Sequence, residues 1–225
     1  MSKPTMIAAE CPSCGAAINI PYYEEINVAD HPEEKARILS GDFFKFTCPE
    51  CGALLPVSGP LLYHDPNVPT MLYLVPQGFE AQTARLDELL ALIQGMEGDQ
   101  TSLYQSRLVT SVDKLLEKIY IQDAGLDDRV VELVKLAYLK HYASALKEKG
   151  TIHASLYMPS EDGSEAQIVF ILGESQEMAS VDFSKDYYVH FATEFEKTLK
   201  EATSVNQFLT IDEKWAAEFV QAQQA

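Results

Sequence analysis

Four cysteines are the residues of this chain whose types and spacing point most directly to chemistry. They lie in two similar pentapeptides, Cys11-Pro12-Ser13-Cys14-Gly15 and Cys48-Pro49-Glu50-Cys51-Gly52. Two residues between the cysteines of a pair let both sulfurs reach one ion, and zinc takes four thiolates in a closed tetrahedral structural site. The pattern therefore predicts one structural Zn²⁺ ion bound by Cys11, Cys14, Cys48 and Cys51.

The residues next to the cysteines favour tight turns. Pro12 and Pro49 fix φ near −65° directly after the first cysteine of each pair. Gly15 and Gly52 follow the second cysteine, where a chain that leaves such a turn often needs a positive φ. We expect each pair at the tip of a hairpin.

Two other uses of the cysteines are a redox centre and disulfides. A redox CPxC motif should open a helix, whereas Ala16 to Ile20 looks like a short strand, and the motif occurs twice. Disulfides belong to oxidising compartments, and the N-terminal residues do not resemble a secretory signal. Both alternatives remain open beside the metal site.

The flanking residues are similar to a known family at this point. The two CPxCG boxes resemble the CpXC domain, a bacterial and archaeal family named for that motif, and the resemblance covers roughly residues 6–140. It includes three further segments, Leu61–Asp65, Lys114–Ile121 and Gly125–Arg129. The resemblance implies metal binding and no particular activity.

Residues for catalysis are few. There is no HExxH, P-loop or GxSxG pattern, and the histidines are scattered at positions 31, 64, 141, 153 and 190. His64-Asp65 is the pair that could lie near the metal, although a local structural role is the simpler interpretation. Tyr187-Tyr188 fits core packing or a partner surface. Four cysteines would close the coordination of the zinc, which argues against a hydrolase at this site.

Length and composition describe an ordinary globular protein. The chain has 225 residues, of which 47% are hydrophobic and 23% are charged, enough for a sizeable core and one or two domains. No apolar run approaches the ~20 residues of a membrane span. We expect a cytoplasmic protein.

The net charge of −17 disfavours some partners. Acidity is concentrated in residues 151–225, which hold 13 acidic and 4 basic residues. Nucleic-acid binding depends on lysine and arginine that meet phosphates, so a nucleic-acid partner is disfavoured. The acidity keeps the chain soluble or recruits a basic partner.

The hydrophobic pattern predicts an α+β fold in three parts. Residues 1–76 form a zinc-ribbon-like β module with one inserted short helix, residues 77–150 a helical region with a helical hairpin, and residues 151–225 a small antiparallel sheet covered by helices. In the first part we expect strands on both sides of each cysteine pair, including 43–47, and short strands at 54–57, 61–63 and 70–75. Prolines at 56, 60, 66, 69 and 76 should confine these to edges and turns.

The second and third parts contain the remaining predicted elements. Helices are expected at 79–96, from Leu108 to Asp123, and from Asp127 to Glu148. Strands are expected at 151–158, 166–173, 179–183 and 206–209. A helix should start at 184–186, and a last one should be capped by Thr210 with Glu213 at its third position.

Hypotheses of different class follow. The first is a zinc-stabilised interaction or regulatory module that binds another protein or a second copy of the chain. The second is an enzyme with an unmarked active site in residues 151–225, and the weakest is a nucleic-acid-linked zinc ribbon. An interaction module should expose an apolar or acidic patch, and an enzyme should show a pocket with convergent polar groups.

Overall fold

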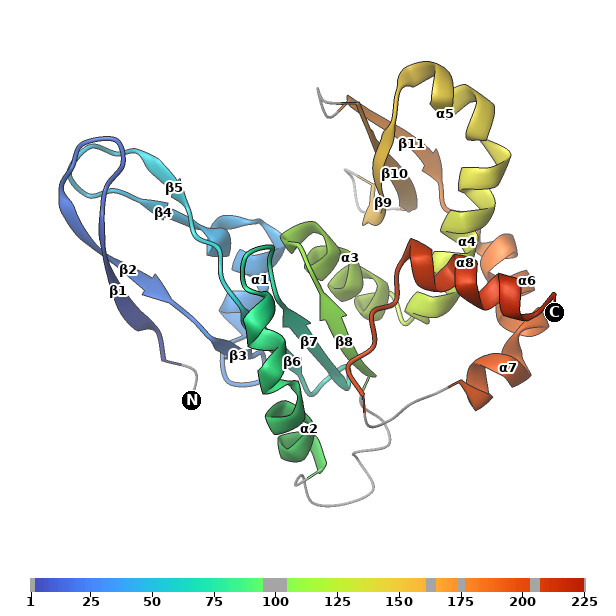
Figure 1. Ribbon diagram of the computed structural model, residues 1–225, viewed down its shortest axis with the longest axis horizontal. Helices are drawn as coiled ribbons and strands as arrows, with labels where there is room; N and C mark the ends of the chain where they lie inside the picture. Colours follow the sequence, from blue (N-terminus) through green and yellow to red (C-terminus); the bar gives the residue numbers. More distant parts are fainter. Residues whose placement is uncertain (1–2, 95–104, 161–164, 174–176, 203–206, 225) are drawn as a thin grey trace. The chain divides into compact units, whose positions relative to one another are not determined.

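The chain folds into two compact units (Figure 1). Its structure is mixed α+β, as the pattern predicts. The computed structural model describes residues 3–94, 105–160, 165–173, 177–202 and 207–224. Unit 1 contains residues 1–116 and 205–209, and unit 2 contains residues 117–204 and 210–225. The division into parts 1–76, 77–150 and 151–225 stays a prediction.

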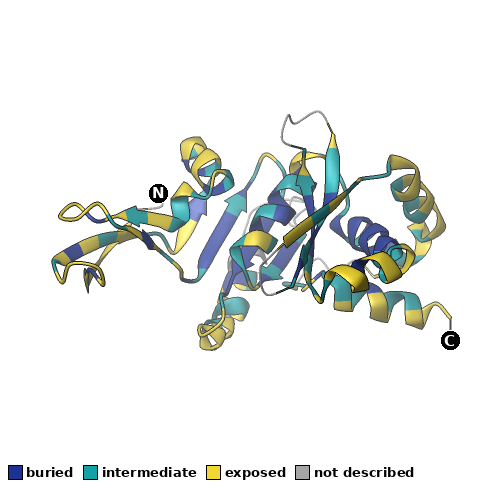
Figure 2. Ribbon diagram, turned by 90° about the horizontal axis from the view of Figure 1, so that it is seen from above, coloured by how far each residue is buried: buried dark blue, intermediate teal, exposed yellow. Residues whose placement is uncertain are grey.

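Two antiparallel hairpins of unit 1 carry the cysteines, as predicted. β1 (Thr5–Glu10) pairs with β2 (Ala17–Tyr22), and β4 (Lys45–Thr47) pairs with β5 (Leu54–Pro56). The hairpins share a small apolar cluster whose buried members are Cys11, Ile18, Cys48 and Leu55. Most other residues of these strands are exposed (Figure 2).

A four-stranded sheet forms the centre of unit 1. Its order is β3 (Glu25–Asn27), β6 (Leu61–Asp65), β7 (Thr70–Leu74) and β8 (Gln105–Val109). β6 and β7 are antiparallel, whereas β3 and β8 run parallel to their neighbours. Every residue of β7 is buried, as expected for a strand covered on both faces.

The position of β6 and β7 corrects one prediction. They are central strands and are not confined to edges, because the prolines at 60, 66, 69 and 76 lie outside the two strands and remove no hydrogen bond from them. β8 corrects a second prediction, the helix that was expected to start at Leu108. Leu108 belongs to this strand, and the helix starts later because the Ser111 hydroxyl accepts a hydrogen bond from the Lys114 backbone N–H.

Shorter helices complete unit 1. They are α1 (Pro32–Leu39), the 3₁₀ helices η1 (Asp42–Phe44) and η2 (Glu80–Arg85), and α2 (Leu86–Gln94). Phe43 and Phe44 were expected in a strand but lie in η1, where the Phe44 N–H donates to the Gly41 carbonyl. The predicted end of the second helix, residues 95–96, lies outside the described residues.

Unit 2 packs helices on a three-stranded antiparallel sheet. The sheet order is β11 (Glu177–Asp182), β10 (Ala166–Leu172) and β9 (Ile152–Pro159). The helices are α3 (Val112–Asp123, which begins in unit 1), α4 (Asp128–His141), α5 (Ala143–Lys149), α6 (Lys185–Glu194), α7 (Glu196–Glu201) and α8 (Glu213–Ala222). Val131, Val134 and Tyr138 of α4 join Ile168 and Phe170 of β10 in the core.

Three boundaries in the C-terminal part differ from the predictions. The helix expected to run to Glu148 is interrupted at Tyr142, which lies between α4 and α5. The cap of α8 is Asp212 and not Thr210, because the Asp212 carboxylate accepts from the Trp215 N–H at 2.9 Å. Of the predicted strand 206–209, Leu209 forms a single bridge with Arg107, and residue 206 lies outside the described residues.

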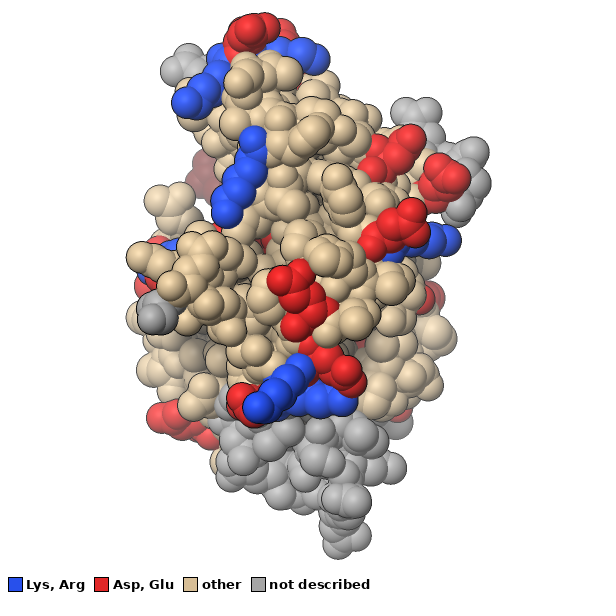
Figure 3. Space-filling view, turned by 90° about the vertical axis from the view of Figure 1, so that its right-hand side faces the viewer, with Lys and Arg blue, Asp and Glu red and all other residues tan. Residues whose placement is uncertain are grey.

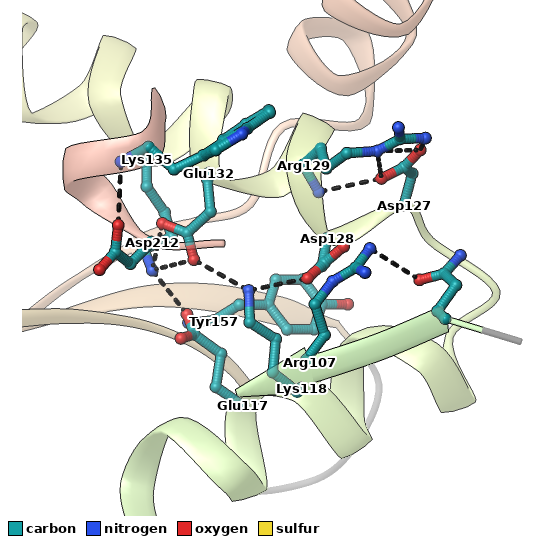
Figure 4. A network of polar contacts seen from close by, with 12 residues as sticks. Arg107, Glu117, Lys118, Asp127, Asp128, Arg129, Glu132, Lys135, Tyr157 and Asp212 are labelled. Atoms are coloured by element: carbon teal, nitrogen blue, oxygen red, sulfur yellow. Dashed lines mark hydrogen bonds and ion pairs between the residues drawn. The ribbon is translucent and has the colours of Figure 1, made fainter. Parts of the chain in front are cut away.

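Charged side chains are buried inside unit 2 (Figure 4). Lys135 Nζ lies 2.7 Å from Glu117 Oε1 and 2.9 Å from the Glu132 carboxylate. Lys118 Nζ lies 3.0 Å from Asp128 Oδ2 and 3.3 Å from Glu132 Oε1. These five side chains are almost completely inaccessible to solvent. We call them the buried charge network.

The buried charge network ties α3 and α4 to the sheet. Glu117 Oε1 also accepts the backbone N–H of Tyr157 in β9 at 2.8 Å. Burial alone would lower the pKa of Lys135, but the surrounding carboxylates, with Glu117 first, outweigh it and raise that pKa above its usual value. Both lysines therefore stay charged, and each carboxylate depends on them for compensation.

Replacing Lys135 with Ala should lower the free energy of unfolding by about 3–5 kcal/mol, because Glu117 and Glu132 would lose their cation inside the protein. Urea unfolding followed by far-UV circular dichroism measures the change. Lys140, exposed on the same helix, is the matched control, and its replacement with Ala should cost about 0.5 kcal/mol or less. Equal losses in the two variants would contradict a stabilising role for the buried lysine.

Candidate metal centre

The two cysteine pairs form turns of nearly identical geometry. Gly15 N–H donates to the Cys11 carbonyl at 2.8 Å, and Gly52 N–H donates to the Cys48 carbonyl at 2.9 Å. Both glycines have the positive φ that the sequence predicts, 73° at Gly15 and 72° at Gly52. Each turn directs two sulfurs to the same side of its hairpin tip.

The four sulfur atoms meet at one point. All of them lie within 4.8 Å of one another, so the cysteines can hold a metal ion together. Cys11 Sγ is 3.8 Å from Cys51 Sγ, and Cys14 Sγ is 3.9 Å from Cys48 Sγ. These separations are far longer than the ~2.05 Å of a disulfide, and all four residues are free cysteines.

The thiols influence each other's ionisation. The backbone N–H of Ser13 is the largest of the effects that lower the pKa of Cys11 to about 7, against the opposing effect of burial. For Cys14 the N–H of Ala16 lowers the pKa, but the neighbouring thiols, with Cys51 first, and burial outweigh it and raise the pKa to about 12. Neighbouring thiolates repel one another, and a bound cation removes this obstacle.

His64 and Asp65 are not part of this group. Among the described residues, the cluster that can hold an ion consists of the four cysteines alone. Both residues lie on β6 in the four-stranded sheet. Burial is the main cause that lowers the pKa of His64, so this imidazole is neutral near pH 7. The structure therefore does not bring the pair to the cysteines.

The buried Asp65 forms an ion pair with the partly buried Lys35, which sequence reasoning missed. Its Oδ2 accepts a hydrogen bond from Lys35 Nζ at 3.0 Å and another from the Tyr63 hydroxyl at 3.3 Å. Its Oδ1 accepts the Asn67 N–H at 3.0 Å. Burial would raise the pKa of Asp65, but Lys35 and these donors outweigh it and hold the pKa below its usual range. The pair joins α1 to the central sheet.

Unit 2 contains an aromatic pocket of about 640 Å³. Tyr120, Tyr157, Phe183 and Tyr188 line it, and burial raises the pKa of both Tyr157 and Tyr188. Tyr188 packs against the core and its hydroxyl accepts the Asp127 N–H at 2.8 Å, whereas Tyr187 is 47% exposed. Raised phenol pKa values keep these hydroxyls protonated, so they supply hydrogen bonds and no base.

Charges on the described surface are mixed. Figure 3 shows one face on which basic side chains lie in separate small groups near acidic ones, without a continuous basic stripe. The net charge of −17 agrees with this picture. Within the described ranges, no helix combines the length and apolar composition that a membrane crossing requires. The absence of a nucleic-acid partner stays a prediction.

Comparisons with known proteins agree with the cysteine pattern. A family model described as "CpXC protein" matches residues 9–135, which include both cysteine pairs. A Treponema pallidum (strain Nichols) protein, described as "Uncharacterized protein", is 28% identical over 144 residues. That alignment covers 60% of this chain and 63% of the relative, so the chain spans less than two thirds of the relative's length. No solved structure matches the chain.

Replacing Asp65 with Asn should lower the free energy of unfolding at pH 7 by about 1–3 kcal/mol, because Lys35 would lose its carboxylate. The pKa of Asp65 is lowered by folding, so its contribution is present above the usual pKa of about 4 and is lost as the pH falls through the lowered value. Wild type and variant should converge below that pH in urea titrations.

Asp42 is the matched control for this measurement. It pairs with Lys45 at 3.5 Å on the surface, and both side chains are exposed. Its replacement with Asn should change the free energy of unfolding by about 1 kcal/mol or less. If the difference caused by the Asp65 change stayed constant from pH 7 to pH 3, its ionisation would not be the cause.

Proposed function

Because the chain belongs to the CpXC family and its four thiols converge, we propose that it binds one structural Zn²⁺ ion and acts as a protein-interaction module. The meeting of the four sulfurs carries the metal part of the proposal. The exposed apolar surface of unit 1 carries the interaction part.

Two of the sulfur–sulfur distances match the dimensions of a zinc site, and all of them are within 4.8 Å. At a Zn–S distance of about 2.3 Å, the sulfurs at the corners of a tetrahedron are about 3.8 Å apart. The pairs at 3.8 and 3.9 Å have this spacing. Four thiolates in a tetrahedron suit zinc or iron. We favour zinc, because it is the metal most common in paired-cysteine turns of this spacing.

Such a site has a structural role. Four protein ligands leave no position for water or substrate, so the ion would stabilise the hairpins and would not act as a Lewis acid. Free thiolates also require a reducing environment, which supports a cytoplasmic location. The hairpins bury little apolar surface of their own, and the metal would replace the missing core.

Unit 1 exposes large apolar side chains on the hairpins that carry the cysteines. On β1, Met6 is 56% exposed and Ile7 44%; Leu54, which starts β5, is 61% exposed. Ile7 also lines a groove of about 390 Å³. Its other apolar lining residues include Ile20, Tyr22, Pro56, Val57 and Phe79, and Glu24 and Arg85 line it as well. Exposed apolar side chains that line a groove of this kind mark interaction sites in soluble proteins.

Replacing Cys14 or Cys51 with Ser should release the metal, because three thiolates bind zinc far more weakly than four. The hairpins should then loosen, because they depend on the metal. Elemental analysis of protein purified without added metal should give one zinc per wild-type chain and close to none in either variant. The amide protons of β1, β2, β4 and β5 should exchange much faster with solvent in both variants.

Non-ligand residues of the same boxes provide the controls. Ser13→Ala and Glu50→Gln keep all four sulfurs and should keep the zinc. Iron in place of zinc would correct the identity of the metal and preserve the site. Metal-free wild-type protein, or full zinc in both serine variants, would refute the proposed ligand set.

A further inference from the structure

β1 offers an open strand edge in unit 1. Among the described residues, it pairs with β2 alone, and no hydrogen bond is found on its other side. Residues Thr5 to Ala9 contain no charge, proline or bulge, which are the usual devices that prevent edge pairing. Met6 and Ile7 are exposed on opposite faces of this strand. The edge is therefore ready to accept another strand.

The other edges of unit 1 are protected. β2 carries Pro21, which has no N–H to donate and is tolerated only where its nitrogen faces away from the partner strand. β3, β4 and β5 have three residues each. β8 is covered, since Leu108 N–H donates to the Leu209 carbonyl at 3.0 Å and Leu209 N–H donates to the Ser106 carbonyl at 3.1 Å.

The edges of unit 2 are less suited to pairing with a second copy. On β9, the Tyr157 N–H donates a hydrogen bond to the Glu117 carboxylate, and the Ser155 hydroxyl donates one to the Glu213 carboxylate. β11 is long and open, but it begins with Glu177 and ends with Asp182. Antiparallel pairing of two β11 strands would place these acids against each other, which disfavours self-association. β1 is therefore the described edge best suited to a second copy of the chain.

We propose that two chains associate through β1 into one continuous sheet, in the order β2-β1-β1-β2. A two-fold axis between antiparallel strands keeps each residue on the same face as its copy, so Ile7 faces Ile7 when the axis passes through it. Thr5 then faces Ala9, and Met6 faces Ala8. In this register every directly opposed pair from Thr5 to Ala9 is uncharged.

Two features favour this register. Ile7 is already paired with Ile20 of β2, so the dimer would align four isoleucines in one row across the sheet. Such pairs of β-branched residues stabilise neighbouring strands. The same register leaves Glu10 at the end of the paired segment, beside the N-terminal flank of the other copy, which carries Lys3. A chain with a net charge of −17 can approach its copy here without opposing acids.

The dimer makes a second copy of the chain the partner of the proposed interaction module. It rests on the proposed function in one respect, because the metal is what fixes the β1–β2 hairpin. Native mass spectrometry of the full chain separates the two ideas, because it reports subunit number and bound metal independently. We expect a dimer with two zinc ions. Ile7→Lys places two lysines opposite each other and should weaken dimerisation at least about tenfold, with one zinc kept per chain.

Met178→Lys on the β11 edge is the control, since Met178 is 76% exposed and lies outside the proposed interface. It should leave the dimer intact. The register has its own test by oxidative cross-linking of the zinc-loaded protein. Ile7→Cys should form a covalent dimer, because the two copies are directly opposed, whereas Thr5→Cys should not, because each Thr5 faces Ala9.

Each outcome supports or refutes either the dimer or the metal site. A wild-type monomer that holds one zinc at concentrations of tens of micromolar or more would overturn the dimer and leave the metal site standing. A dimer that survives Ile7→Lys but not Met178→Lys would move the interface to β11. If Ile7→Lys lost its metal, the cross-linking pair would decide, and equal cross-linking of both cysteine variants would refute the register.

Discussion

Four thiols that meet at the tips of two hairpins are the constraint on which the rest of unit 1 depends. The buried part of the hairpin cluster consists of two cysteines and two aliphatic residues, Ile18 and Leu55. An isolated two-stranded hairpin is at best marginally stable in water, and this small cluster adds little to either one. The arrangement is understandable if the sulfurs share a cation, because one ion then crosslinks segments that are far apart in the sequence.

The two units are stabilised in different ways. The central sheet of unit 1 has a strand, β7, that is wholly buried and is apolar except for Thr70. Unit 2 has an apolar core of its own but also encloses the buried charge network between α3, α4 and β9. Desolvation makes buried ions poor contributors to net stability, but each partner requires the others. The network therefore links α3, α4 and β9 through charged groups that each need their partners in place.

Local chemistry was predictable from the sequence, and long-range pairing was not. The cysteine spacing with its glycines gave the two turns correctly. Leu108 was wrongly assigned to a helix because it lies four residues before Val112, a spacing that fits one continuous helix. The same spacing also fits a strand that is followed by a separately capped helix, which is what the structure has. The burial of charged side chains on α3 and α4 was not predicted, since periodicity does not show that another element covers the polar side of a helix. Lys35 and Asp65 carry no pattern that links them across 30 residues.

The return of the chain to unit 1 near its end has a consequence for biosynthesis. Leu209 hydrogen-bonds along β8, and the ring of Phe208 packs against Tyr73 at a centroid distance of 6.3 Å. Both residues are translated after most of unit 2 has been made. Until Phe208 and Leu209 have been synthesised, the outer edge of β8 in the nascent sheet stays uncovered. Unit 1 therefore cannot finish folding in strict order from the N-terminus. Final closure of the first unit has to wait until Phe208 and Leu209 have left the exit tunnel.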